Sequence, residues 1–118
     1  MPSKTIEADV LVVDDTAANL EVVSQVLEDS GYEVSVALGG DRALKLASMH
    51  PPDLILLAVQ MPGMDGFETC RRLKSAPESW DIPVIFMTAL DDTAHKVKAF
   101  DMGAVDYITK PFHEKELL

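Results

Sequence analysis

The sequence predicts an α/β fold with a parallel sheet, in a single domain of residues 1–118. Short runs rich in β-branched and other apolar residues alternate with longer stretches at helical spacing, and three of the short runs are continuously apolar, as in strands covered on both faces. At 118 residues and 47% apolar content, the chain is long enough for one core and too short for two. The predicted strands are residues 9–14, 32–37, 54–59, 83–88 and 106–109.

The first predicted helix follows the first strand. Leu20, Val23 and Leu27 recur three and four residues apart. Thr16 precedes them as a candidate cap, and Gly31 follows them as a helix stop. The pattern therefore predicts a helix with one apolar face between the first two strands.

Three further groups of apolar residues predict helices between the later strands, and a last helix is expected from about Glu114. The chain stops at Leu118, after about one turn, so this last helix is expected to be cut short. Residues 75–83 are predicted to form a surface loop in which Trp80 packs over the edge of the domain. The three groups are Leu44 with Ala47, Phe67 with Cys70 and Leu73, and Ala94 with Val97.

The charge of the chain limits its partners. Twenty Asp and Glu against ten Lys and Arg give a formal charge of -10, which repels nucleic acid and anionic lipid. Neither a signal peptide nor an apolar run of about 18 residues is present, so we expect a cytoplasmic domain. The single cysteine, Cys70, can form no internal disulfide.

Polar residues stand at the carboxyl ends of several predicted strands, which is where open parallel sheets bind ligands. Asp14 and Asp15 end the first strand, Thr88 the fourth, and Lys110 follows the fifth. Adjacent carboxylates favour a hard cation such as Mg²⁺. A hydroxyl and an ammonium opposite them are suited to hold phosphoryl oxygens. The third strand, by contrast, ends in Ala58.

Each of these signals has an ordinary structural explanation. Asp14 and Asp15 could simply complement a helix dipole, Thr88 could cap a helix, and Lys110 could be a surface lysine. Taken singly, those explanations are favoured. The coincidence of all of them at one edge of the sheet favours a site.

Four blocks of sequence together resemble the receiver domain of two-component response regulators, of the kind found in chemotaxis regulators and hybrid histidine kinases. The resemblance covers nearly the whole chain, in the family's order and spacing. It implies a flavodoxin-like sheet of five parallel strands in the order 2-1-3-4-5, with helices on both faces. The blocks are VLVVDDTAAN, PDLILLAVQMPGMDG, PVIFMTA and GAVDYITKPF.

The resemblance also implies a Mg²⁺-assisted transfer of a phosphoryl group from a histidine kinase or phosphotransfer domain to an aspartate at the end of the third strand. By position, Asp14 and Asp15 resemble the metal-binding acids, with Asp15 the direct ligand, and the backbone carbonyl of Gln60 a further ligand. Such a domain is a signalling module and not an enzyme.

Three more residues match positions that respond to the phosphoryl group. Thr88 and Lys110 resemble the residues that receive its oxygens, and Tyr107 resembles the aromatic switch residue that follows the movement of Thr88. Residues 93–118 match the surface that such regulators use for dimers and targets, which the short last helix would leave incomplete.

Ala58 departs from the family, because it occupies the phosphoacceptor position and a methyl group is no nucleophile. One interpretation is a receiver made phosphorylation-dead by an engineered substitution, with weakened Mg²⁺ binding. It is favoured because the assisting residues are all retained. The alternative is a natural pseudo-receiver that works as a phosphorylation-independent interaction or dimerisation module.

A third interpretation, a phosphohydrolase with Asp14 as nucleophile, fits poorly. Asp14-Asp15-Thr16 lacks the D-x-D spacing of haloacid dehalogenase-type enzymes, and the chain has no room for their cap domain.

Overall fold

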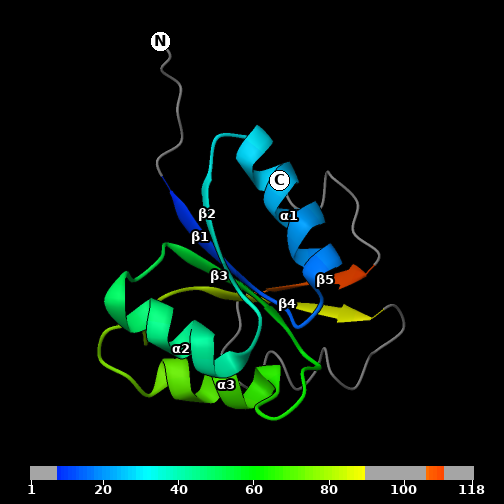
Figure 1. The fold of residues 1–118 in the computed structure, drawn as a ribbon. Helices are drawn as coiled ribbons and strands as arrows, with labels where there is room; N and C mark the ends of the chain where they lie inside the picture. The colour runs from blue at the N-terminus through cyan, green and yellow to red at the C-terminus, as the bar shows by residue number, and fades with distance from the viewer. Residues whose placement is uncertain (1–7, 90–105, 111–118) are drawn as a thin grey trace.

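The computed structural model describes residues 8–89 and 106–110, with side chains up to Met87 (Figure 1). Strands and helices alternate along the first part of the chain, as the sequence predicts. In chain order the elements are β1 (Asp9–Val13), α1 (Ala17–Asp29), β2 (Glu33–Ala37), α2 (Gly40–Met49), β3 (Leu54–Ala58), α3 (Gly66–Lys74), β4 (Val84–Ala89) and β5 (Asp106–Lys110).

The five strands form one parallel sheet in the order β2-β1-β3-β4-β5, so the predicted fold class and strand order are confirmed. Each predicted strand overlaps the observed one, and no end differs by more than one residue. The predicted helices at Ala94–Val97 and from Glu114, and the 93–118 surface, lie outside the described residues.

Helices cover both faces of the sheet: α1 lies on one face, and α2 and α3 lie side by side on the other (Figure 1). This explains why β1, β3 and β4 are continuous apolar runs. Every residue of β1 after Asp9 is at most 1% exposed. The rings of Phe67 on α3 and Phe86 on β4 meet at a centroid distance of 5.2 Å and join that helix layer to the sheet. None of the described helices is long and apolar enough to span a membrane.

Helix α1 buries Leu20, Val23 and Leu27, which confirms its predicted face. Gly31 has φ +97°, a conformation that favours glycine, and the chain turns there into β2. Thr16 occupies the N-cap position, but its side chain does not cap the helix, so that part of the prediction is wrong. Its hydroxyl instead lies 3.5 Å from the Asp15 carboxylate, while its backbone N–H donates to the Asp14 carboxylate, at 3.1 Å.

The loop after α3 is held by side chains that donate hydrogen bonds to backbone carbonyl oxygens. The Lys74 ammonium donates to the carbonyl oxygens of Ile82, at 2.7 Å, and Trp80, at 3.3 Å. The buried Ser79 hydroxyl donates to the Leu73 carbonyl, at 2.7 Å. The indole of Trp80 remains 61% exposed, so the prediction that it packs over the domain edge is wrong. The loop is fixed by carbonyl contacts that need no ring.

Gly66, the first residue of α3, touches the end of β3. Its N–H donates to the Val59 carbonyl, at 2.7 Å. A Cβ at this position would overlap the Ala58 carbonyl oxygen, far inside contact distance. Residue 66 must therefore be glycine for the loop to return to the strand end.

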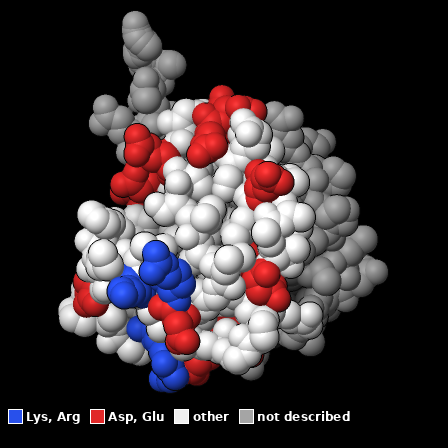
Figure 2. All heavy atoms as spheres, in the orientation of Figure 1, with Lys and Arg blue, Asp and Glu red and all other residues white. Residues whose placement is uncertain are grey.

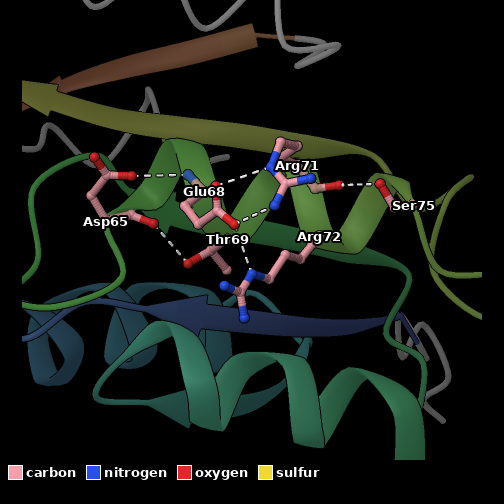
Figure 3. A network of polar contacts seen from close by, with 6 residues as sticks. All are labelled: Asp65, Glu68, Thr69, Arg71, Arg72 and Ser75. Carbon is pink, nitrogen blue, oxygen red and sulfur yellow. Dashed lines mark hydrogen bonds and ion pairs between the residues drawn. The ribbon is translucent and has the colours of Figure 1, made fainter.

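The first turn of α3 is secured by polar contacts (Figure 3). The Asp65 carboxylate accepts the Glu68 N–H, at 2.9 Å, a standard N-cap. The Thr69 hydroxyl donates back to the Asp65 carbonyl, at 2.8 Å. Glu68 accepts hydrogen bonds from the guanidinium groups of Arg71 and Arg72. These contacts fix where the loop after β3 ends.

The bonds from Arg71, and then from Arg72, lower the pKa of Glu68 from its usual 4.5 to about 2. The Glu68 ion pairs therefore contribute stability above about pH 4.5 and lose it as the pH falls towards 2. Both guanidinium groups are largely exposed, so solvent and salt screen the pairs and the contribution is small.

We expect Gly66→Ala to destabilise the domain by about 1 to 3 kcal/mol or more, because the new methyl group overlaps β3 backbone that cannot yield. Urea unfolding at neutral pH measures this. Gly39→Ala is the matched control: residue 39 is extended, and a Cβ there would meet no other part of the chain within 4 Å. Its effect should stay within about 0.5 kcal/mol. Equal effects of the two substitutions would contradict the proposed contact.

We expect Glu68→Gln to lower the urea midpoint slightly at pH 7, and this difference should shrink below about pH 4.5, where the carboxylate is protonated in the unfolded chain before it is protonated in the folded one. The double variant with Arg71→Gln is the control, because Glu68→Gln should cost less once Arg71 is gone. A difference that is constant from pH 7 to pH 3 would show that charge plays no part.

Candidate functional site

The strand register brings the predicted site positions to one edge of the sheet. Val13 of β1 pairs with Leu57 of β3, so Asp14 and Ala58 each lie one residue beyond this pair. Ala58 pairs with Met87 of β4, the residue before Thr88. The register therefore brings these backbone positions together, as the sequence predicts.

Lys110 ends β5 and pairs with Ala89, one step past the Thr88–Thr109 pair. Tyr107 pairs with Phe86, near the middle of the same two strands. Backbone positions alone are described for Thr88, Tyr107 and Lys110, so the predicted roles of their side chains remain predictions.

Asp14 is fully buried directly after β1. One carboxylate oxygen accepts the Thr16 N–H, at 3.1 Å, and the other accepts the Asn19 side-chain amide, at 3.3 Å. The Asp14 N–H in turn donates to the Ala37 carbonyl at the end of β2. Burial of a carboxylate is costly unless donors meet it, and these donors also fix its orientation.

Asp15, in contrast, is exposed. The Thr16 hydroxyl is 3.5 Å from its carboxylate, too long for a strong hydrogen bond. The pair therefore combines one oriented, buried carboxylate with one that faces solvent. That Asp15 is the direct metal ligand stays a prediction.

The donor set at this edge suits a hard cation, but it has one carboxylate fewer than it would have with Asp at position 58. Carboxylate and carbonyl oxygens are the ligands Mg²⁺ prefers, and Gln60, whose carbonyl is a predicted ligand, lies two residues past Ala58. Within the part of the chain that is described, no three His, Cys, Asp or Glu side chains gather in a metal-binding group. Two acids and a carbonyl are the kind of oxygen ligands that can hold Mg²⁺ together with water.

Ala58 is the last residue of β3 and is fully buried. Around it, the loop after β3 is fixed at both ends: the Val59 N–H donates to the Met87 carbonyl, and Gly66 closes back on the Val59 carbonyl. Gly63, with φ +75°, turns the loop between them. Among the described residues, the loop after β3 is thus fixed around a side chain that cannot react.

Other polar residues are placed elsewhere. The Asp53 carboxylate accepts the Asp9 N–H, at 2.8 Å, at the start of β1, and so lies at the opposite edge of the sheet from Ala58. Cys70 is buried in α3, where desolvation raises the pKa of its thiol, as expected of a packing residue.

Sequence reasoning missed Asn19. Its amide lies on the first turn of α1, five residues after the carboxylate it contacts. An amide at that distance behind an acidic pair, at the start of a helix, was the available signal.

The chain is similar to known proteins over nearly all its length. The family model "Response regulator receiver domain" matches residues 10–118. "Response regulator PleD" of Caulobacter vibrioides is 45% identical over 109 residues, which are 92% of this chain and 24% of PleD. The "DNA-binding dual master transcriptional regulator RpaA" of Synechocystis sp. is 43% identical over 109 residues, 92% of this chain and 45% of RpaA. The chain thus spans less than half of these relatives.

Solved structures of response regulators resemble this chain as well. A putative response regulator from Chloroflexus aurantiacus has a TM-score of 0.91 at 36% identity, covering 95% of this chain and 92% of that one. Chemotaxis protein CheY4 of Vibrio cholerae has a TM-score of 0.89 at 33% identity, covering 95% and 93%. Sequence and fold therefore lead to one conclusion: this chain belongs to the response regulator receiver domain family of two-component signalling.

Proposed function

We propose that this receiver domain has a working phosphorylation pocket disabled at a single side chain, Ala58. The observation that carries the proposal is its place: Ala58 ends β3, level with Asp14 and next to the strand position of Thr88. Receiver domains accept a phosphoryl group at this point, and the methyl group offers no atom to take it. The domain works as a signalling module and not as an enzyme.

Receiver domains bind Mg²⁺ at an acidic phosphorylation site. In this chain Asp15 would hold the ion directly, with Asp14 and the backbone carbonyl of Gln60 completing the protein ligands. When bound, Mg²⁺ supplies positive charge that neutralises the acids and a phosphoryl group. The buried donors on Asp14 keep its carboxylate facing one way, so little ordering is needed on binding.

The remaining predicted roles belong to the strands beside Ala58. Thr88 would donate its hydroxyl to one phosphoryl oxygen, and the Lys110 ammonium would pair with another. Tyr107 would report the position of Thr88. The partner that presents the phosphoryl group would be a histidine kinase or a phosphotransfer domain. Without a phosphoryl group the inactive arrangement prevails, because only differential binding shifts such an equilibrium.

An engineered substitution accounts for the retained pocket residues, since they share no other obvious task. One observation favours the second candidate, a natural pseudo-receiver that acts through binding or dimerisation alone. Asp14 is held by donors at the start of α1, so it has a structural role that would persist after the chemistry was lost. Dimerisation through residues 93–118 belongs to this candidate as well.

We expect Ala58→Asp to gain one phosphoryl group when incubated with Mg²⁺ and acetyl phosphate, and the parent protein to gain none. Intact-mass spectrometry measures this. Ala58→Asn is the matched control, because an amide has nearly the shape of the carboxylate without its nucleophilic charge. If Ala58→Asp also fails to react, the pocket has lost more than its acceptor and the pseudo-receiver candidate replaces our proposal.

We expect Ala58→Asp to be less stable than the parent protein without metal, by about 1 kcal/mol, because a third carboxylate meets the acidic pair. Mg²⁺ should reverse this, since the added ligand tightens binding and binding stabilises the folded state. Thermal melts with and without Mg²⁺ measure both effects, with Ala58→Asn as the uncharged control. Equal stabilisation of all three proteins by Mg²⁺ would contradict the assigned ligand set.

A further inference from the structure

A shallow groove of about 680 Å³ runs between α1 and β2, on the flank of α1 that faces the edge of the sheet. Val34, Val36 and Leu38 project into it at alternate positions, as one face of a strand does. Leu20 adds a further apolar contact from the helix. The groove is thus an apolar surface at the outer strand of the sheet.

Large parts of this surface are open to water. Val36 is 45% exposed and Leu38 is 59% exposed. β2 is the edge strand of the sheet, and α1 covers it only in part, so no described element fully covers these side chains. Contiguous apolar side chains that remain exposed mark interaction surfaces in folded proteins.

The charge around the groove has one sign. The Lys and Arg residues whose side chains are described all lie on α2 and α3, which Figure 2 shows as blue groups gathered at the lower left. From residue 8 to residue 39 there is no Lys or Arg. Glu21 and Glu28 lie on the groove itself.

We propose that this groove is the docking site for a basic amphipathic helix of a partner protein. The apolar floor suits the apolar face of a helix, and the acidic border suits Lys or Arg on its flanks. Nucleic acid and anionic membranes are disfavoured by the same border. A second copy that used this face would bring acid against acid. Docking here does not depend on residue 58 or on phosphorylation.

The border also sets the spacing of the partner's charges. Glu21 and Glu28 are seven residues apart on one side of α1, which is two turns, or about 10 Å. A helix that lies along α1 would meet both with cations seven residues apart. Between them, the Ser24 hydroxyl lines the groove, buried and with no hydrogen bond to the described residues.

The test uses the whole chain, labelled with ¹⁵N, and a synthetic amphipathic peptide of about five helical turns, with Leu on one face and Lys seven residues apart on its flanks. A peptide of the same composition, ordered so that no apolar face forms, is the control. We expect the first peptide alone to shift amide signals along α1 from residue 17 to 28 and along β2.

Surface variants then separate the apolar contact from the charge. Leu38→Ser should weaken peptide binding about tenfold, while Val22→Ser should leave it within about twofold. Val22 is the matched control because it is 53% exposed on α1 but does not line the groove. Glu21→Gln with Glu28→Gln should weaken binding and reduce its dependence on salt.

Several results would overturn the proposal. Equal binding of the two peptides, or shifts scattered over all acidic surfaces, would show attraction by charge alone. Equal losses in Leu38→Ser and Val22→Ser would remove the groove from the contact. Shifts confined to the outer backbone of β2 would indicate strand addition, and self-association of the chain that Leu38→Ser abolishes would identify a second copy as the occupant.

Discussion

The pairing of β1 with β3 in the centre of the sheet is the constraint on which the site depends. Both strands are buried on their two faces, so their register is fixed by the core and not by the residues that follow them. A slip of one residue would move every side chain of the strand to the opposite face, where it would no longer match the packing around it. The core therefore holds Asp14 and residue 58 level, whatever side chain stands at position 58.

The helices then add orientation to that placement. The start of α1 brings the Thr16 N–H and the Asn19 amide to the Asp14 carboxylate, and α3 brings Gly66 back to the end of β3. Packing sets the position of the edge, and a few hydrogen bonds set the direction of its groups. This division explains how the frame persists around an unreactive alanine.

The sheet, its strand order and the first three helices could be predicted from the sequence, because they rest on periodicity and on four motifs in a fixed order. The details around Asp14 could not. Thr16 reads as a helix cap, but its hydroxyl lies 3.5 Å from the Asp15 carboxylate and accepts no N–H of the first turn. Trp80 reads as a packing residue, but backbone carbonyls bound by Lys74 hold its loop and leave the ring outside. Such outcomes depend on which of several nearby partners the fold brings closest, and spacing alone does not rank them.

The close approach of Gly66 to the Ala58 carbonyl separates architecture from chemistry at this edge. Residue 58, which in our proposal decides whether a phosphoryl group is accepted, meets the loop through its backbone carbonyl. The residue that decides whether the loop can close carries no side chain at all. In terms of tolerance to change, the backbone contact at position 58 does not depend on its side chain, whereas position 66 has no room for any side chain. If our proposal holds, one substitution at position 58 restores the chemistry and keeps the scaffold.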